Sequence, residues 1–283
     1  MNILLTGSTG FIGRILKESW QNQYQLSAPS RQELDLLDAD AVERCLRDGR
    51  FDTVVHCCNT NDVVHPELAS KMLEYNLRMF FNLERCSRLY GKLYYFGSGA
   101  EYDMRHYVPR MKENYFGAHI PADPYGFSKY VMSKQAGGNI YDLRLFGVFG
   151  PGEEWQRRFI SNMIYQALHC GVMHMDRHMY FDYLYTRDLV KIMDWFLAHE
   201  PRHHHYNVCS GQENDLFALA RIIQEETGTH AEIVLNGPDW KPAYSGSNER
   251  LETEMGKMEL TPLRAAVREM ISWYLENGFT EKV

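Results

Sequence analysis

Short apolar runs alternate along the chain with longer stretches in which apolar residues recur every three or four positions. The first run, Asn2–Thr6, is typical of a strand buried on both faces of a parallel sheet. Comparable runs follow at residues 24–28, 53–58 and 92–96, with helical stretches between them. Strands that alternate with helices predict right-handed crossovers and therefore a parallel sheet. We expect an α/β fold built on a doubly wound parallel sheet.

A glycine-rich turn directly follows the first predicted strand, in the spacing Gly7-x-x-Gly10-x-x-Gly13, and leads into a helical stretch. In this context Gly7 permits a tight turn, Gly10 lets the backbone approach a pyrophosphate, and Gly13 lets the helix pack closely on the strand. The start of the helix offers unpaired N–H groups to phosphates. A glycine turn without a ligand is the alternative. We predict a Rossmann-type dinucleotide site whose loop also includes Thr9, Phe11 and Ile12.

The second predicted strand ends in the turn Pro29-Ser30-Arg31, which has no acidic residue at its tip. An NAD enzyme usually carries Asp or Glu there, whereas an NADP enzyme accommodates the 2′-phosphate with a nearby arginine. A hydroxyl and a guanidinium group suit a phosphate, so NADP(H) is the favoured cofactor and NAD(H) the alternative. A solvated surface position for Arg31 also stays open. Further predicted cofactor contacts are Asp35, Leu36, Cys57 and Asn59.

Composition narrows the class of protein. The 283 residues include 30 Lys and Arg against 37 Asp and Glu, and this net charge of −7 argues against a nucleic-acid partner. No apolar run reaches the ~18 residues of a membrane span, and no signal peptide precedes the first strand. The six cysteines form no Cys-x-x-Cys pair. We therefore expect a reduced, cytoplasmic protein, and interpret His203–His205 as a loop rather than a metal site.

Tyr125 and Lys129 stand four residues apart in a stretch that is expected to be helical. Residues at this spacing share one helix face, and an ammonium group beside a phenol lowers the pKa of the phenol toward the working pH. A general acid or base works best there. Alone, the spacing also fits an exposed pair on a helix surface. Ser98 ends the fourth predicted strand, at the sheet edge where Gly7 and Asn59 are expected, so one crevice is predicted to collect these groups.

In combination these features resemble the extended short-chain dehydrogenase/reductase family, in particular its nucleotide-sugar-modifying branch. The dehydrorhamnose-reductase-like and fucose-synthase-like members of that branch are closest in pattern. The resemblance covers roughly the first three quarters of the chain. The motifs that carry it are the glycine loop, Ser98 four residues before Tyr102, Tyr125-x-x-x-Lys129 after a proline, and residues 143–151, 181–188 and 206–211.

This resemblance implies a Ser-Tyr-Lys site acting on a nucleotide-diphosphate sugar. Tyr125 would exchange a proton with a sugar hydroxyl or ketone, and Ser98 would hydrogen-bond the same oxygen. Lys129 would hold the nicotinamide ribose and lower the pKa of the tyrosine. A hydride would move between the nicotinamide and a sugar carbon. Family members also lead us to expect a homodimer formed by two long helices, predicted at residues 66–90 and 124–136.

Four positions depart from the family pattern. Gly99 and Ala100 replace the Asp-Glu pair of the dehydratases, so elimination of water is not expected. Ala100 also stands where fucose-synthase-like enzymes carry a cysteine, which argues against double epimerisation. Gly147 and Phe181 replace an asparagine and an arginine, which puts the carried-over substrate contacts in doubt. A plain ketoreductase or a 4-epimerase remains.

The favoured function is therefore NADPH-dependent reduction of a 4-keto nucleotide-diphosphate sugar. A nucleotide-sugar 4-epimerase with retained NAD is the first alternative, and a non-catalytic protein that senses NADP(H) is the second. The intact Ser98, Tyr125 and Lys129 argue against the second alternative. Candidate substrate contacts are Tyr102, Arg157 and Arg250, although packing for the tyrosine and solvated surface for the arginines are equally plain interpretations.

The order of the predicted elements indicates two interleaved domains. After Pro151 the chain leaves the expected sheet, and it returns with a helix from Thr186 and a strand at His205–Val208. We expect residues 1–146 and 186–210 to form the dinucleotide-binding domain. Residues 147–185 and 211–283 would form a smaller substrate-binding lobe.

Overall fold

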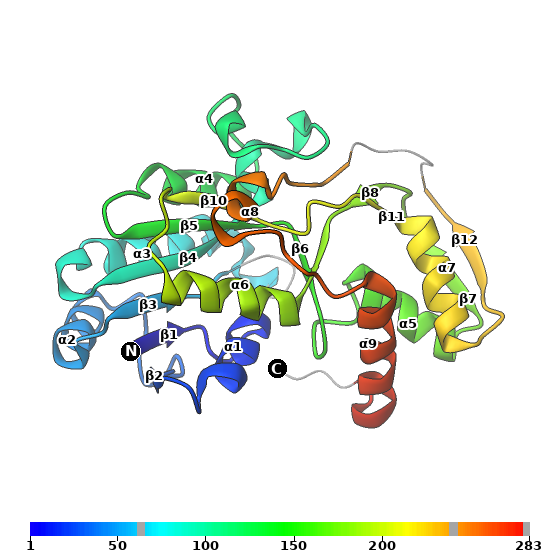
Figure 1. The fold of residues 1–283 in the computed structure, drawn as a ribbon, viewed down its shortest axis with the longest axis horizontal. Coiled ribbons are helices and arrows are strands. Elements are labelled where there is room, and N and C mark those ends of the chain that lie inside the picture. The colour runs from blue at the N-terminus through cyan, green and yellow to red at the C-terminus, as the bar shows by residue number, and fades with distance from the viewer. Residues whose placement is uncertain (61–65, 238–242, 280–283) are drawn as a thin grey trace. The chain divides into compact units, whose positions relative to one another are not determined.

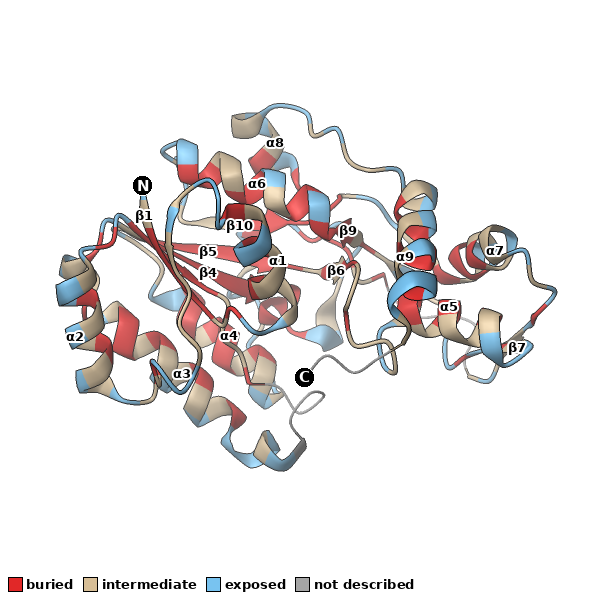
Figure 2. Cartoon of the chain, turned by 90° about the horizontal axis from the view of Figure 1, so that it is seen from below, coloured by how far each residue is buried: buried red, intermediate tan, exposed pale blue. Residues whose placement is uncertain are grey.

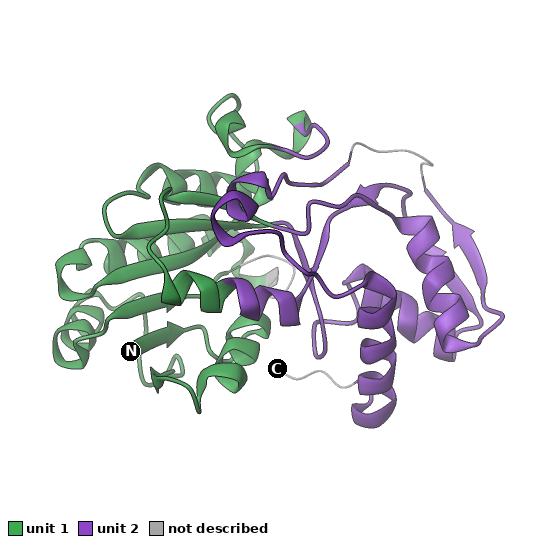
Figure 3. Ribbon diagram, viewed as in Figure 1, with its two compact units in different colours: residues 1–106, 112–145, 193–208 green, residues 107–111, 146–192, 209–283 purple. Residues whose placement is uncertain are grey.

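The computed structural model describes residues 1–60, 66–237 and 243–279. They form two compact units (Figure 3). Unit 1 comprises Met1–His106, Lys112–Leu145 and Met193–Val208, and unit 2 comprises Tyr107–Met111, Phe146–Ile192 and Cys209–Val283. The expected division had placed Tyr107–Met111 and residues 186–192 in the first domain, whereas both segments pack within unit 2. Residues 238–242 and 280–283 of the expected substrate lobe lie outside the description.

Unit 1 is built on a six-stranded sheet in the order β10-β5-β4-β3-β1-β2 (Figure 1). Every neighbouring pair in it is parallel, which confirms the predicted doubly wound α/β class. β1 lies between β2 and β3, so the chain turns in opposite directions on its two sides. Ligands bind at such a switch point, beyond the carboxyl ends of the strands. The strands are β1 (Asn2–Thr6), β2 (Gln25–Ser27), β3 (Thr53–His56), β4 (Lys92–Ser98), β5 (Ile140–Leu145) and β10 (His205–Val208).

Helices cover both faces of this sheet, and all its strands except the edge strand β2 are almost wholly buried (Figure 2). On one face, Leu93 and Tyr95 of β4 join a core with α2 (Ala39–Gly49), α3 (Met72–Glu84) and α4 (Pro124–Lys134). Tyr94, which alternates to the other face, packs on Phe196 of α6 (Thr186–Ala198). The helix after the glycine loop, α1 (Phe11–Trp20), lies on that second face, where the Trp20 indole donates to Asp194 at 2.7 Å.

Side-chain caps determine where two of these helices begin. Asp38 accepts hydrogen bonds from the backbone N–H groups of Asp40 and Ala41 at the start of α2. Asp35, a predicted cofactor contact, accepts from the Leu37 N–H at 3.0 Å. At the start of α4, Asp123 accepts from the Gly126 N–H at 2.7 Å, and Pro124 occupies the first helical turn. The helix that carries Tyr125 is thereby fixed at its first residue.

The long helix predicted over residues 66–90 is divided. A 3₁₀ helix, Pro66–Lys71, precedes α3, and a second, Ser87–Leu89, follows it. The Tyr90 hydroxyl donates to the carbonyl oxygen of Leu83 at 3.0 Å and so occupies an acceptor at the end of α3. Further 3₁₀ turns lie at Gly99–Tyr102, Met104–His106 and Glu113–Tyr115.

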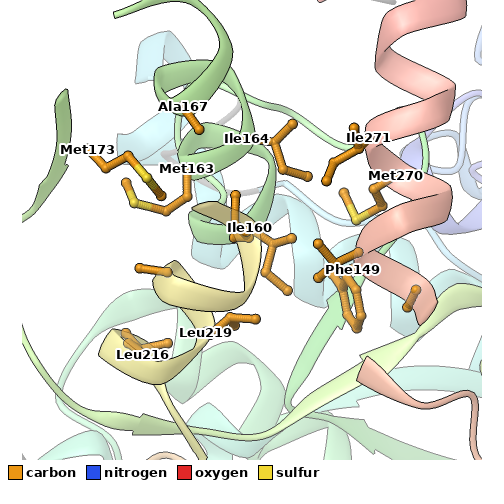
Figure 4. Packing of buried hydrophobic residues seen from close by; sticks show 14 of the residues in the cluster. Phe149, Ile160, Met163, Ile164, Ala167, Met173, Leu216, Leu219, Met270 and Ile271 are labelled. Atoms are coloured by element: carbon orange, nitrogen blue, oxygen red, sulfur yellow. The ribbon is translucent and has the colours of Figure 1, made fainter. Parts of the chain in front are cut away.

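Unit 2 contains three two-stranded sheets and a helical core. Met163 and Ile164 of α5, Leu219 of α7 and Met270 of α9 pack together (Figure 4). The first of these helices begins at Phe159, eight residues after Pro151, where the chain was expected to leave the sheet. The elements are β6 (Gly147–Phe149) with β9 (Tyr183–Tyr185), β7 (Val172–Met175) with β12 (Glu232–Leu235), β8 (Tyr180–Phe181) with β11 (Asn214–Asp215), α5 (Phe159–His169), α7 (Leu216–Thr227), α8 (Glu249–Met255) and α9 (Leu263–Asn277). Throughout the described residues, no helix has the length and apolarity needed to cross a membrane.

Candidate dinucleotide and Ser-Tyr-Lys site

The glycine loop between β1 and α1 has a shape that other residues would disturb. Gly7 has a φ of 72°, and a Cβ on it would lie 2.7 Å from the backbone nitrogen of Cys58. A Cβ on Gly13 would lie 2.1 Å from the Gly7 carbonyl oxygen. Gly10 differs, because its Cβ would meet only that same oxygen, at an ordinary 3.4 Å. The fold itself does not require glycine at position 10, whereas the close approach of a phosphate would require it, so this position fits a ligand contact.

The start of α1 is suited to bind an anion. Gly10 is its N-cap residue, and among the described residues no side chain caps the first turn. Thr9 and Gly10 are exposed, while Phe11 and Ile12 are half-buried. Uncapped N–H groups at the positive end of a helix dipole are the usual partners of a pyrophosphate. The residues present therefore fit the phosphates of a dinucleotide.

The turn after β2 contains an acidic residue that the sequence analysis missed. Glu33 accepts a hydrogen bond from the backbone N–H of Ser30 at 2.7 Å, and this bond lowers the pKa of the Glu33 carboxyl below its ordinary value. The predicted arginine, Arg31, is exposed in the same turn. The sequence alone does not show that Glu33 caps this turn, because the cap depends on how the turn is folded. A cofactor bound at this turn would therefore meet two opposite charges, those of Arg31 and Glu33, rather than Arg31 alone.

The segment after β3 lies against the glycine loop, and the Cys57 N–H donates to the carbonyl oxygen of Thr6 at 3.1 Å. Asn76 of α3 holds this segment by two bonds to the backbone of Thr60, at 2.7 and 2.9 Å. Next to it, the side-chain oxygen of Asn59 is buried and has no hydrogen-bond partner within the described ranges. Buried amide oxygens are rarely left without a donor, so Asn59 fits a contact to the cofactor.

Ser98 lies at the junction of β4 and the 3₁₀ turn that follows, and it is buried. Its hydroxyl oxygen accepts the N–H of Ala100 at 3.1 Å, while its own backbone N–H donates to Glu101 at 2.9 Å. This reciprocal capping box holds the turn at both ends. Because the hydroxyl oxygen accepts from the turn, its hydrogen is left to donate to a substrate oxygen.

Lys129 is only 3% exposed and lies beside Tyr125, with the ammonium nitrogen 5.9 Å from the centroid of the tyrosine ring. Its Nζ donates to the Phe96 carbonyl oxygen at 2.8 Å. Burial lowers the pKa of Lys129 to about 8, although the carboxyl groups of Glu101 and Asp142 oppose that shift. Tyr125 and Lys129 therefore share one helix face, as the spacing predicted, and Lys129 is bonded two residues before Ser98.

The surroundings of Tyr102, predicted as a possible substrate contact, favour the alternative of packing. It is 1% exposed, and its hydroxyl donates to Asn207 at 2.6 Å and accepts from Arg144 at 2.8 Å. A phenol engaged in this way inside the core has no free donor for a ligand. Its place is structural, as the packing alternative held.

The two candidate substrate arginines lie in unit 2. Arg157 is exposed, and its Nε lies 3.4 Å from a carboxylate oxygen of Glu154. Arg250 is half-buried on α8. Their contact with a diphosphate stays a prediction.

The two departures from the family pattern in unit 2 are linked physically. A Cβ on Gly147 would lie 2.5 Å from the ring of Phe181 and 2.4 Å from the carbonyl oxygen of Asp182. The Gly147 N–H donates to that same oxygen at 3.1 Å. An aromatic ring at position 181 and the absence of a side chain at position 147 therefore belong to one packing arrangement. The polar pair expected from the family cannot occupy this backbone geometry unchanged.

Comparison with known proteins agrees with this geometry. The model of the NAD dependent epimerase/dehydratase family matches residues 3–209. Among curated relatives, the probable GDP-L-fucose synthase 1 of Oryza sativa subsp. japonica is 28% identical over 103 residues, which is 36% of this chain and 31% of that protein. The aligned segment thus spans under a third of the rice protein's length. ADP-L-glycero-D-manno-heptose-6-epimerase of Cupriavidus pinatubonensis is 24% identical over 262 residues, which covers 79% of this chain and 77% of that protein.

Among solved structures, a GDP-L-fucose synthetase from Naegleria fowleri bound to NADP superposes with a TM-score of 0.84. It is 17% identical in sequence, and the match covers 99% of this chain and 94% of that one. At this identity the likeness shows the fold alone, and the fold agrees with the parallel sheet of unit 1.

Proposed function

Because the chain belongs to the NAD dependent epimerase/dehydratase family, in the extended branch of the short-chain dehydrogenases/reductases, we propose that it reduces a 4-keto nucleotide-diphosphate sugar with NADPH. The observation that carries the proposal is the arrangement of Ser98, Tyr125 and Lys129 in unit 1. A capped serine hydroxyl and a tyrosine beside a buried ammonium group are the donors that a ketone oxygen requires when it becomes a hydroxyl.

In this function each residue has a distinct task. The bound nicotinamide would supply the hydride to the carbonyl carbon. Tyr125 donates its phenolic proton to the oxygen that develops negative charge, and Ser98 donates a hydrogen bond to the same oxygen. The positive charge of Lys129 favours the phenolate that remains on Tyr125. Gly7, Gly10, Gly13 and the first turn of α1 would hold the pyrophosphate, with Asn59 as a further contact.

Gly99 and Ala100 favour a simple reduction over other reactions of the family. Neither residue has a side chain that ionises, so the two positions directly after Ser98 hold no acid–base pair. Ala100 is buried and offers its backbone N–H to Ser98. A second proton transfer at a carbon beside the ketone would need an ionisable group at one of these two positions.

A 4-epimerase is the second candidate, because the relative matched over the greatest length reported above is named an epimerase. The same three side chains would then first remove a proton from a sugar hydroxyl and later return it to the oxygen. Cofactor consumption separates the two functions, because an epimerase regenerates its nicotinamide within each cycle.

The test is to mix the protein and NADPH with a panel of nucleotide-linked 4-keto-6-deoxy sugars and to follow the loss of nicotinamide absorbance. A reductase consumes one NADPH per sugar reduced, and Tyr125→Phe abolishes that consumption. Parallel reactions with nucleotide-linked hexoses, analysed by chromatography, detect epimerised product. Product without net cofactor change would establish the epimerase, and absence of both reactions would contradict an enzyme of either kind.

A further inference from the structure

Two carboxyl groups face one another behind the serine turn. Glu101 of that turn and Asp142 of β5 are both fully buried. The point that a Cβ on Gly97 would occupy lies 2.1 Å from Asp142 Oδ1 and 2.3 Å from Glu101 Oε1, so both oxygens flank it. Two ionised carboxylates this close, away from water, repel strongly, and such a pair usually retains one proton.

The guanidinium group of one residue, Arg144, bonds both carboxyl groups. Arg144 Nε lies 2.8 Å from Glu101 Oε2 and 2.8 Å from Asp142 Oδ2, and the arginine is 1% exposed on its side chain. Its other nitrogens donate to the hydroxyl groups of Tyr102 and Ser133, each at 2.8 Å. The guanidinium group of Arg144 carries one positive charge. If the two carboxyl groups share one proton, they carry one negative charge together, and the three side chains are neutral in sum.

The hydrogen bonds indicate where the proton is needed. Glu101 Oε1 accepts from the Ser98 N–H at 2.9 Å, and Asp142 Oδ2 accepts from Arg144 and from Ser133, each at 2.8 Å. Asp142 Oδ1 is buried and no donor bonds it within the part of the chain that the structure describes; the Tyr95 hydroxyl that faces Asp142 is likewise buried without a partner there. A proton on Glu101 would supply that donor from the oxygen on the other side of the Gly97 position.

We propose that Glu101 is a positioning residue for Ser98 and that its carboxyl group shares one proton with Asp142. Its effect on turnover rests on the proposed function, whereas the shared proton is a property of the fold. Glu101 touches no substrate in this account. It holds the Ser98 N–H and connects the turn to Arg144 at the centre of unit 1.

The surroundings agree with a proton on Glu101. Burial and the Asp142 carboxylate raise the pKa of Glu101. Burial is the largest influence on the Asp142 carboxyl and would raise its pKa, but Arg144, His205 and Ser133 together outweigh burial and lower that pKa. The other ionisable groups that face the pair are Tyr95 of β4, Lys129 of α4 and His205 of β10, whose Nδ1 lies 3.4 Å from Asp142 Oδ2.

If Glu101 and Asp142 share one proton, the conservative variants Asp142→Asn and Glu101→Gln should differ in their effect on the serine turn. In Asp142→Asn, the amide oxygen keeps the bonds to Arg144 and Ser133, and the amide nitrogen donates to Glu101, so the charge and the hydrogen bonds are those of the wild type. In Glu101→Gln, the amide oxygen can accept the Ser98 N–H only if the amide nitrogen faces Arg144. Both the amide nitrogen and the guanidinium group are donors, so no hydrogen bond forms between them. Asp142→Asn is therefore tolerated, and Glu101→Gln and Glu101→Leu disturb the serine turn.

The test uses the full chain and three readouts. The first is unfolding by denaturant between pH 5 and 8. Because the folded-state pKa of Glu101 is raised, the wild type loses stability as pH rises above the ordinary Glu value of ~4.3. Asp142→Asn should lack that slope. Glu113→Gln, a buried carboxyl that accepts from the Asn207 N–H, is the matched control and should keep it. An unchanged slope in Asp142→Asn overturns the shared proton.

The second readout is hydrogen exchange at the Ser98 amide, which should be about tenfold faster or more in Glu101→Gln and unchanged in Glu113→Gln. Equal exchange in Glu101→Gln and wild type overturns the positioning role. The third is turnover with the keto-sugar, where kcat should fall about tenfold to a hundredfold at unchanged NADPH affinity. If no sugar is turned over by the wild type, the proposed function fails, and the first two readouts still decide this inference.

Discussion

The ammonium group of Lys129 donates to the carbonyl oxygen of Phe96, 2.8 Å away, on the strand that ends two residues later in Ser98. One bond thereby ties the helix that carries Tyr125 to the strand that carries the serine. The donor is a buried charge, and burial lowers the pKa of Lys129 to about 8. The placement of the site is therefore coupled to a proton that Lys129 holds less tightly than a lysine exposed to water would.

Replacement of Lys129 by methionine should change how stability depends on pH. The folded-state pKa of about 8 lies below the ordinary lysine value of ~10.4, so the unfolded chain binds more protons between these two values. The free energy of unfolding should consequently rise from about pH 8 to ~10.4 in the wild type and lack that rise in Lys129→Met. Denaturant titrations across this range measure it. Lys134→Met, an exposed lysine at the end of the same helix, should keep the wild-type slope.

Loss of either hydroxyl group should impair chemistry without impairing cofactor binding. Tyr125→Phe removes the proposed proton donor and should lower kcat by about 10² to 10⁴-fold, the usual contribution of a general acid. Ser98→Ala should lower kcat by a comparable amount, because it removes a donor to the same oxygen. Fluorescence titration with NADPH should give nearly wild-type affinity for both variants. Tyr130→Phe, a buried tyrosine on the same helix, is the control, and full activity of Tyr125→Phe would refute the assigned role.

The parts of the fold and site that the sequence predicted are those set by local spacing. Gly7 and Gly13 are recognisable because backbone geometry demands both of them within seven residues of chain. Tyr125 and Lys129 follow from the helical repeat alone. Alternating strands and helices were enough to give the parallel sheet, because crossover handedness leaves few arrangements.

Side-chain partners distant in sequence could not be predicted in this way. Tyr102 reads as a polar residue at a strand end, yet its hydroxyl bonds Asn207, 105 positions later. Glu101 sits beside the motif serine, but its role depends on Arg144 and Asp142 from the next strand. These polar residues bond one another because the folded sheet buries them side by side. Which residues are buried together depends on the assembled sheet and not on any short segment of the sequence.

Cofactor preference should respond to both charges in the turn after β2. Arg31→Ala removes the guanidinium group suited to a 2′-phosphate and should weaken NADPH relative to NADH by about tenfold, in line with one charge-assisted contact. Glu33→Gln removes a negative charge but keeps an oxygen that accepts the Ser30 N–H, so it should strengthen NADPH relative to NADH. Dissociation constants for both dinucleotides, measured at two salt concentrations, check these changes, because screening weakens an exposed charge effect.

Because Arg31 and Glu33 carry opposite charges, their two variants should shift the preference between NADPH and NADH in opposite directions. If Arg31→Ala leaves the NADPH-to-NADH ratio untouched, the arginine is ordinary solvated surface and the preference for NADP(H) loses its basis. If Glu33→Gln has no effect while Arg31→Ala does, the carboxylate only caps the turn. Arg14, a half-buried residue on α1, offers an Arg14→Ala control for general loss of positive charge near the glycine loop.

Gly147→Ala should destabilise unit 2, because the new methyl group would lie 2.4 Å from the backbone oxygen of Asp182. Overpacking of this kind typically costs about 1–3 kcal/mol in the free energy of unfolding. Phe181→Leu removes the ring that also lies against this position, yet it should not rescue Gly147→Ala, because the Asp182 oxygen belongs to the backbone and stays. Gly137→Ala is the control, since a Cβ there meets nothing within 4 Å. Recovery of stability in the double variant would show that the ring, and not the backbone, excludes a side chain at position 147.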